Sequence, residues 1–449
     1  MSLRSFLEFL EKKKQVIHVK EEVSTKHEIS SIMGAFQNGP ALLFENVEGH
    51  STKVVGNVCG TRERTLQALG VSVEEIYAKH REAMLSPEAP KVVDDCSVKE
   101  VVEPPRLSKI PVLTHFEKDA GAYITSGVVS AKSPDGEVEN VSIHRLQVLN
   151  DRQLAIRLVP RHLYRLWTMA KEKGEDLDVA ISIGVHPAVL LAAACSPPFG
   201  VSEFGVANRL LGGRLSLVKC EKVDAYAVAE AELVLEGKIS VTKEVVEGPL
   251  VDITGTYDVQ RSQPVVDLVS VMHRKDYVYQ ALLPGGSEHR ILMGLPREAA
   301  IYEAVSNVVP KVKAVNLTSS GCGWLHAVIS IEKQTDGDAK NALLAAFAGH
   351  PSLKHAVVVD SDIDVYNPEQ VEWAIALRFQ ADEDLVVIPK ARGSTLDPSA
   401  DQESGLTSKL GIDATRPLRV PKDKGSKAKI PKTGTSQKII TKICRELSE

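Results

Sequence analysis

The sequence lacks the usual fingerprints of nucleotide-binding and hydrolytic enzymes. None of GxGxxG, GxxxxGK[ST], GxSxG or HExxH occurs in its 449 residues. The common phosphate-binding loops, the nucleophile elbow and the helical zinc motif are therefore excluded as the source of its chemistry. Any activity must come from polar residues that belong to none of these motifs.

Cysteine is sparse and scattered. None of the six cysteines belongs to a CxxC pair or to a short spacing that would suit a zinc site or a disulfide framework. They are Cys59, Cys96, Cys195, Cys220, Cys322 and Cys444. This pattern favours a reducing compartment, so we expect a cytoplasmic protein.

Long apolar runs and a large net charge are also absent. The longest apolar run, PAVLLAAAC at 187–195, is far shorter than the roughly 20 residues that span a bilayer. The 54 basic and 59 acidic side chains give a net charge of −5, which indicates no nucleic-acid partner. Leu3, Phe6, Leu7 and Leu10 have helical spacing, so the N-terminus predicts an amphipathic helix and not a signal peptide.

The length exceeds the roughly 250 to 300 residues that one hydrophobic core supports, so we predict a multidomain α+β and α/β fold. The proline-rich stretch 101–113 marks one boundary. Short β-rich runs follow it, interrupted by helical spacing after Pro160, and helix-like and strand-like segments alternate beyond residue 295. The predicted division is residues 1–104, 105–295, 296–420 and a basic, mobile tail at 421–449.

A set of polar residues interrupts apolar strand and loop segments. It consists of Asn140, Arg145, His162, Glu203, Glu247 and Asp252. Each alone is more often an ordinary turn, surface or helix-start residue, but buried groups of this kind are costly unless they pair, bind a metal or perform chemistry. An amide oxygen, an imidazole and a carboxylate together suit Mn²⁺ or Mg²⁺, and such a cation could hold a phosphate.

Several segments resemble, in order and spacing, the UbiD family of non-oxidative decarboxylases, which use prenylated FMN. The segments are GAYITSG at 121–127, VPRH at 159–162, GVSE at 200–203, LVLEG at 233–237, EGPLVD at 247–252, VVVDSDIDV at 357–365 and SGLTSKLGIDAT at 404–415. The resemblance implies an N-terminal α/β domain, a central split β-barrel of the flavin-reductase type and a C-terminal α/β domain. It also implies prenylated FMN, Mn²⁺ or Mg²⁺ with K⁺ as a further candidate, a flavin prenyltransferase as cofactor supplier, and a homo-oligomer.

The resemblance also assigns roles to individual residues. Asn140, His162 and Glu203 match metal ligands that bridge to the flavin phosphate, and Lys409 matches a lysine that reaches the cofactor phosphate. Arg161, next to His162, is a further cofactor-binding candidate because of its charge. Arg145, Glu247 and Asp252 match the catalytic set: the arginine faces the substrate carboxylate, Glu247 pairs with it, and Asp252 is the proton donor. Because Asn140 and Arg145 are five residues apart, a regular strand would point them to opposite faces, so we expect a bulge or a strand that passes both ends of the cofactor.

The substrate is less defined by the sequence than the reaction. Relatives often read E-G-P-F-G-E where this chain has Leu250, Val251 and Asp252, and often carry Gln where this chain has Arg161. The added positive charge favours trans-anhydromevalonate 5-phosphate as the substrate. A 4-hydroxybenzoate-type aromatic acid is the first alternative and a non-catalytic prenylated-flavin carrier is the second. Glu247 and Asp252 argue against the carrier, which needs neither.

Overall fold

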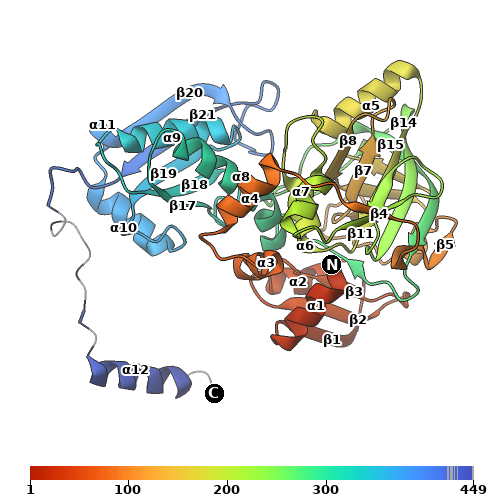
Figure 1. The fold of residues 1–449 in the computed structure, drawn as a ribbon, viewed down its shortest axis with the longest axis horizontal. Coiled ribbons are helices and arrows are strands. Elements are labelled where there is room, and N and C mark those ends of the chain that lie inside the picture. The colour runs from red at the N-terminus through yellow and green to blue at the C-terminus, as the bar shows by residue number, and fades with distance from the viewer. Residues whose placement is uncertain (422–423, 425–427, 429, 432, 447–449) are drawn as a thin grey trace.

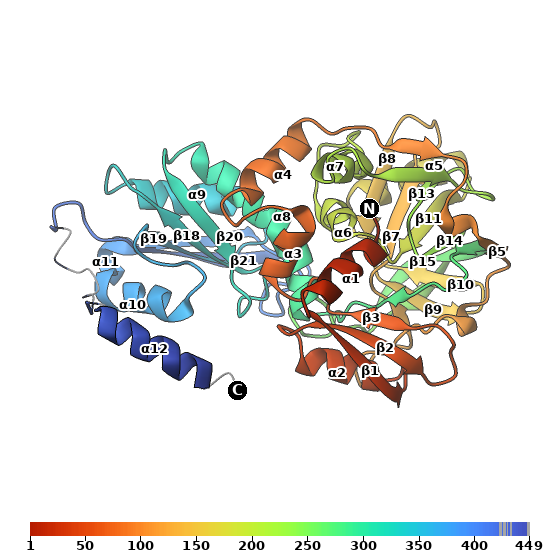
Figure 2. The same cartoon turned by 60° about the horizontal axis from the view of Figure 1, so that its bottom comes forward.

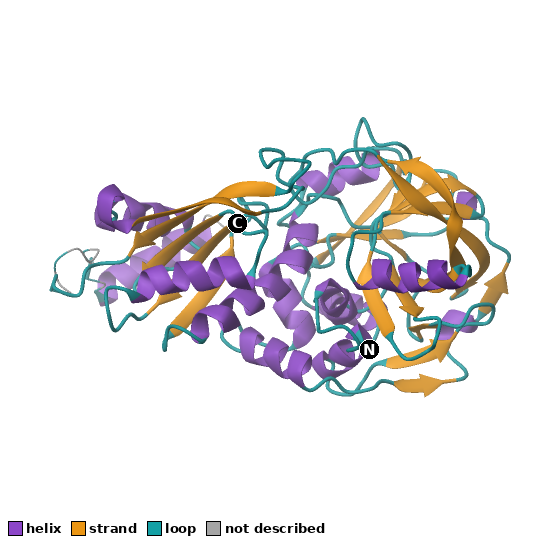
Figure 3. Ribbon diagram, turned by 90° about the horizontal axis from the view of Figure 1, so that it is seen from above, coloured by secondary structure: helices purple, strands orange, loops and turns teal. Residues whose placement is uncertain are grey.

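The computed structural model describes residues 1–421, 424, 428, 430–431 and 433–446. Figure 1 shows two β-rich regions, with α4 (Ile76–Leu85) and α8 (Ser287–Ser306) between them. The same division is seen from above in Figure 3, where a band of helices separates the two groups of strands. The mixed α/β multidomain class predicted from the sequence is confirmed.

The N-terminal part is a four-stranded sheet covered by short helices. Its order is β1-β2-β3-β16, with β1 Val16–Val23, β2 Ala41–Val47, β3 Val54–Gly56 and the distant β16 Tyr279–Gln280. The helices are α1 Leu3–Lys12, α2 Glu28–Ala35 and α3 Arg62–Leu69. The predicted N-terminal helix is confirmed, because α1 buries Leu3, Phe6 and Leu10 and begins at a capping box between Ser2 and Ser5.

The central part is built on a nine-stranded sheet. Its order is β6-β9-β10-β15-β14-β11-β7-β8, and β5 pairs with β15. The strands are β5 Val101–Glu103, β6 Tyr123–Ile124, β7 Val128–Lys132, β8 Glu139–Ile143, β9 Leu146–Asn150, β10 Gln153–Ile156, β11 Leu177–Ile183, β14 Leu233–Glu247 and β15 Arg261–His273. Three-residue and two-residue links, 125–127 and 144–145, join strands at opposite ends of this order, so the sheet curls and its ends meet.

Smaller elements complete the central part. A three-stranded sheet has the order β13-β12-β4, with β4 Lys91–Val93, β12 Ser216–Lys219 and β13 Tyr226–Val228. The helices are the 3₁₀ turns η1 Ser97–Lys99 and η2 Leu107–Lys109, and α5 His162–Lys173, α6 Pro187–Ala194 and α7 Glu203–Leu210. Helix α5 follows Pro160 as predicted and buries Leu163, Leu166, Trp167 and Ala170.

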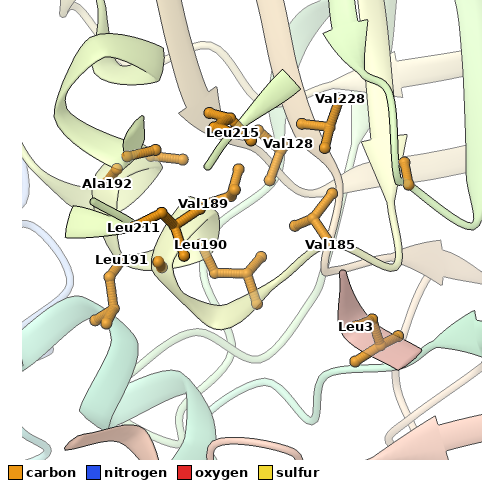
Figure 4. Packing of buried hydrophobic residues seen from close by; sticks show 14 of the residues in the cluster. Leu3, Val128, Val185, Val189, Leu190, Leu191, Ala192, Leu211, Leu215 and Val228 are labelled. Carbon is orange, nitrogen blue, oxygen red and sulfur yellow. The ribbon is translucent and has the colours of Figure 1, made fainter. Parts of the chain in front are cut away.

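The apolar run at 187–195 forms α6, which is buried on all sides. Figure 4 shows Val189, Leu190 and Leu191 of this helix packed among Leu211, Leu215 and Val128. A helix that is apolar all round is a core helix when it is this short. Within the described residues, none of the helices has the length and apolarity to cross a membrane.

The C-terminal part is a five-stranded sheet with helices on both faces (Figure 2). Its order is β17-β18-β19-β21-β20, with β17 Val312–Leu317, β18 His326–Ile331, β19 His355–Asp360, β20 Leu385–Arg392 and β21 Leu406–Ala414. Helix α9 Asp338–Gly349 packs on the face with Ala356 and Val358, whereas α10 Pro368–Arg378 packs on the face with Val357 and Val359. Such alternation is what a buried central strand requires.

Two elements at the end of the chain complete the description. Helix α11 is Ala381–Asp384, and α12, Gly434–Glu446, has no buried residue. The prediction of a mobile basic tail falls partly on residues outside those described. Within the tail, the sequence analysis did not predict the helix that residues 434–446 form.

Candidate active site

One guanidinium, that of Arg145, gathers three carboxylates. Its Nε and Nη2 atoms donate to the two oxygens of Glu247 at 2.9 and 2.8 Å, in the bidentate geometry that makes such pairs strong. Nη1 donates to Asp252 at 3.2 Å, and Nη2 lies 3.0 Å from Asp258. The Glu247 side chain is fully buried, whereas that of Asp252 is 21% exposed. A ligand can therefore reach Asp252 but not Glu247.

Asp258 is a member of this cluster that the sequence analysis missed. Besides Arg145, its carboxylate accepts from Arg261 at 2.8 Å and lies 3.8 Å from Arg157. Burial raises the pKa of Asp258, but the hydrogen bond from Arg261 and the charges of the arginines outweigh burial and hold the pKa below its ordinary value. The only sequence signal was its place six residues after Asp252, in the same loop.

The loop between β14 and β15 positions these acids by folding back on itself. Glu247 is the last residue of β14, and the amide of Asp258 donates to the carbonyl of Leu250 at 2.9 Å. The amide of Asp252 donates to Thr256 and that of Gly255, at φ +77°, donates to Asp252. A side chain is strained at that φ, which is why glycine suits the tip. The turn aims Asp252 back at Arg145.

The uncharged side chain of Tyr123 also supports Glu247. The Tyr123 hydroxyl lies 3.2 Å from Glu247 and 3.1 Å from the amide oxygen of Gln147. Burial, and then the charge of Glu247, raise the pKa of Tyr123, so the hydroxyl keeps its proton and donates it. Glu247 is therefore fixed by hydrogen bonds from Tyr123 as well as from Arg145.

A second group brings together the three predicted metal ligands. The Asn140 amide donates to Glu203 Oε1 at 2.9 Å, and His162 Nδ1 lies 3.9 Å from the same oxygen. Glu203 Oε2 accepts the backbone N–H of Val141 at 2.7 Å. Asn140 and Glu203 are buried, and the His162 side chain is 30% exposed. The three side chains share a focus, while metal binding itself stays a prediction.

Each ligand candidate lies at an end or edge of an element. Asn140 is on β8, His162 is the first residue of α5, and Glu203 is the first residue of α7, whose N-cap Ser202 accepts from Phe204. The expected bulge is not how Asn140 and Arg145 are reconciled: β8 ends at Ile143, and Arg145 lies in the link before β9. The segment 140–162 thus contains three strands, β8, β9 and β10, before α5 begins.

The surroundings of Glu203 fit a cation. Within the described residues, no group of three or more His, Cys, Asp or Glu side chains has metal-site geometry. The set of Asn140, His162 and Glu203 contains only two residues of these types, because its third member is an asparagine. However, the half-buried Glu139 lies nearby, and its buried Oε1 atom has no hydrogen-bond partner. Burial raises the pKa of Glu139, with a contribution from Glu203. Two carboxylates with buried oxygens and this few cationic partners suit an O/N-ligated divalent ion.

The two remaining predicted residues lie on a basic cluster. Lys409 is buried, and its Nζ donates to the carbonyls of Pro351 and Leu353 at 2.6 and 2.5 Å. Burial lowers the pKa of Lys409 to about 8. Arg161 caps α5, and both cations act on the buried His350, whose pKa is lowered to about 3 by burial and then by Arg297, Lys409 and Arg161. The charges of Lys409 and Arg161 thus both reach His350, although the two residues are more than two hundred positions apart in the sequence.

Two histidines near the site were not assigned a role from the sequence. His144 hydrogen bonds Ser142 at 2.9 Å and the carbonyl of Arg157 at 2.8 Å, and burial lowers its pKa to about 4. It is therefore neutral at physiological pH. His289 on α8 lies close enough to Asp252 for the carboxylate to raise its pKa, although burial has the larger effect and lowers it.

Comparison with known proteins gives three family matches in chain order. They are the N-terminal domain (residues 7–84), the Rift-related domain (91–287) and the C-terminal domain (290–414) of the UbiD family, 3-octaprenyl-4-hydroxybenzoate carboxy-lyase. Together they extend over most of the chain. The sequence motifs from 121–127 to 357–365 lie within the last two of these matches.

Individual relatives are similar over nearly their whole length. The anhydromevalonate phosphate decarboxylase of Methanothermobacter thermautotrophicus is 47% identical over 418 residues, 93% of this chain and 97% of that protein. The enzyme of that name from Aeropyrum pernix is 47% identical over 423 residues, 93% of each chain. Among solved structures, the UbiD-class enzyme HmfF from Pelotomaculum thermopropionicum in complex with FMN has a TM-score of 0.94 at 42% identity, covering 96% of this chain and 98% of that chain.

Proposed function

The chain belongs to the UbiD family of carboxy-lyases, and from that premise we propose that it decarboxylates trans-anhydromevalonate 5-phosphate with prenylated FMN. The observation that carries this proposal is the near-full-length similarity to anhydromevalonate phosphate decarboxylases. The Arg145 cluster supports it, since an arginine beside a partly exposed acid is what binding a carboxylate and returning a proton require.

We further propose the division into domains 1–104, 105–295 and 296–420, with the basic tail 421–449, and a central split β-barrel of the flavin-reductase type. Support for the barrel comes from the short links that join the two ends of the nine-stranded sheet. The family matches change from one domain to the next at residues 84–91 and 287–290. These transitions support a division into three domains, and each precedes the corresponding proposed boundary at 104 or 295.

Arg145 is proposed to bind the substrate carboxylate. Its bidentate pair with Glu247 fixes the plane of the guanidinium, so that Nη1 is presented to the ligand at the place where it now meets Asp252. When the bond between the carboxyl carbon and its neighbour breaks, CO₂ leaves and an electron pair remains on the carbon. Asp252 then delivers a proton to that carbon. The prenylated flavin supplies the electron sink that no side chain offers.

The cofactor is proposed to be held at its phosphate. Asn140, His162 and Glu203 would ligate Mn²⁺ or Mg²⁺, and K⁺ is a further candidate in the same region. Rotation of the Asn140 amide by 180° exchanges its N and O, so its oxygen can face a cation. Arg161 and Lys409 would add positive charge to the phosphate. A flavin prenyltransferase is the proposed cofactor supplier, and a homo-oligomer is the proposed assembly.

Co-expression with a flavin prenyltransferase tests this function. The purified protein should absorb as a flavoprotein and release CO₂ from trans-anhydromevalonate 5-phosphate, with little release from 4-hydroxybenzoate. Faster turnover of 4-hydroxybenzoate would instead identify the protein as an aromatic acid decarboxylase. Cofactor binding without CO₂ release from either acid would favour the carrier.

A further inference from the structure

One face of α8 runs from the catalytic loop to the basic cluster. His289, Met293 and Arg297 recur every four residues, and the Nε2 of His289 contacts the sulfur of Met293 at 3.0 Å. The His289 end lies near Asp252, as the effect of that carboxylate on the histidine indicates. Because eight residues of helix rise about 12 Å, this face joins two chemically different regions.

At the far end of that face, Arg297 has no acidic partner. Its Nη2 donates to the Ser196 hydroxyl at 2.8 Å, its guanidinium lies 5.6 Å from the centre of the Trp324 ring, and its buried Nε has no hydrogen-bond partner. Throughout the part of the chain that the structure describes, no carboxylate lies within ion-pair distance of this side chain. The guanidinium therefore has donors that are free to bind a ligand.

The neighbours of Arg297 are also cations. Arg161 is the charge that acts most strongly on it, and Arg392 acts in turn on Arg161. The charges of Arg297 and Lys409 both lower the pKa of the buried His350. Burial and Arg161 together lower the pKa of Arg297 to about 10, so the charge persists at neutral pH although its surroundings disfavour it. Positive charges gathered without a counter-ion suit a dianionic ligand such as a phosphate.

Two phosphates could use this cluster, that of the cofactor and that of the substrate. We propose that Arg297, with the Ser196 hydroxyl, binds the phosphate of the substrate, whereas Lys409 serves the cofactor. This proposal rests on the proposed function. Helical side chains point back toward the helix N-terminus, so the guanidinium of Arg297 reaches toward the catalytic loop.

The substrate has the length that this arrangement needs. Five carbons separate its carboxylate oxygens from its phosphate ester, which is roughly 7 Å for carbon–carbon bonds of about 1.5 Å. With the carboxylate at Arg145, next to Asp252 and so near the His289 end of α8, the phosphate would extend along this face toward Arg297. Arg297 is thus a specificity-determining residue, which selects for the phosphate and takes no part in bond breaking.

Arg297→Gln tests this assignment when the phosphorylated acid is compared with its dephosphorylated alcohol. In the parent, kcat/KM should favour the phosphorylated acid. The substitution should lower that kcat/KM by about 10- to 100-fold, mainly through KM, and leave the alcohol unchanged, because only a charge-assisted hydrogen bond to phosphate is lost. Arg297→Lys should restore part of the preference. Arg81→Gln removes an exposed arginine of α4 and is the matched control, which should behave as the parent.

A binding measurement separates the two phosphates without turnover. FMN affinity, followed by quenching of flavin fluorescence, should be unchanged in Arg297→Gln. Weaker FMN binding in Arg297→Gln would assign this arginine to the cofactor and overturn the proposal. Equal kcat/KM values for the phosphorylated acid in parent, Arg297→Gln and Arg297→Lys would also overturn it, while the decarboxylase function stands. A parent that fails to turn over the phosphorylated acid would instead reject the proposed function and its phosphate subsite together.

Discussion

Two of the three carboxylates around Arg145, those of Glu247 and Asp252, have different surroundings, and these imply different roles. Glu247 is fully buried, accepts two hydrogen bonds from the guanidinium and a third from Tyr123. Asp252 is partly exposed and receives one bond from Arg145 and one from the amide of Ile253. A fixed, buried acid positions its partner, whereas an accessible acid can exchange a proton with a ligand.

Asp252→Asn should therefore remove proton delivery and little else. An amide is isosteric, and its oxygen can keep the contact with Arg145 at the cost of the bond from the Ile253 amide. Flavin content should therefore match the parent and the unfolding midpoint should change little, while the rate falls roughly 10² to 10⁴-fold. The measurement is deuterium exchange into a product analogue, run beside CO₂ release. Exchange at the parental rate in the variant would place the proton donor elsewhere.

Glu247→Gln should affect binding as well as turnover. Glutamine keeps only one acceptor oxygen, so one of the two bonds from Arg145 is lost and the other becomes a neutral one. The guanidinium is then oriented mainly by Asp252 and Asp258. We expect KM for the acid to rise roughly tenfold or more, with a fall in kcat. Steady-state kinetics at saturating flavin would measure both. Glu244→Gln, on the exposed part of the same strand β14, is the matched control and should leave both constants unchanged.

At the scale of elements, the sequence predicted regular segments better than interruptions. The spacing of Leu163, Leu166 and Trp167 identified α5 because one face packs on the core. The break between β8 and β9 was not predicted, because Ile143 and Leu146 continue an apolar pattern while the chain crosses between the two ends of a curled sheet. That crossing is a tertiary feature, and it is what places Arg145 opposite Glu247 and Asp258.

Helix α8 contacts the N-terminal part through Glu288, a carboxylate whose pKa is raised. Glu288 accepts the amide of Cys59 at 2.7 Å, and burial raises its pKa to about 7 despite the backbone hydrogen bonds that lower it. Between about pH 4.5 and 7 the folded state therefore holds a proton that the unfolded state has lost. Stability from this group is thus present at low pH and falls as the pH rises through that range.

Glu288→Gln should remove this pH dependence. The parent should lose on the order of 3 kcal/mol of unfolding free energy from this group between pH 4.5 and 7, since one pKa unit corresponds to about 1.4 kcal/mol. Urea unfolding at several pH values in the same ionic strength would measure it. If parent and variant show parallel pH profiles, Glu288 is not the titrating group.

For the whole molecule, the order of segments and the candidate residues could be predicted from the sequence, but the contacts among those residues in the folded chain could not. Asn140, His162 and Glu203 could be selected from the sequence because polar residues stood within apolar segments. Asp258, Glu139 and Arg297 were missed, because single acids and arginines in loops and helices are usually solvated. The significance of Asp258 comes from the arginines that surround it, and that of Glu139 and Arg297 from buried atoms without a hydrogen-bond partner. Only the assembled chain shows these surroundings.

Lys409 illustrates this long-range assembly and gives the last prediction. Lys409→Ala should weaken FMN binding with little effect on folding, because its buried charge is costly in the free protein and useful only beside a phosphate. Burial lowers the pKa of Lys409 to about 8, so in the protein without FMN this side chain loses its proton above that pH. The FMN affinity of the parent should therefore fall as the pH rises from about 7 to 9.

The variant should lack that pH dependence, and fluorescence titration at each pH would measure it. Lys354→Ala is the matched control: Lys354 precedes β19, which pairs with β21 beside Lys409, but its Nζ is neutralised by Asp397 at 2.7 Å. It should keep both the affinity and the pH profile of the parent. FMN binding equal to the parent's in Lys409→Ala would reject a role in holding the cofactor, and the phosphate would then have to be neutralised by Arg161 and the metal alone.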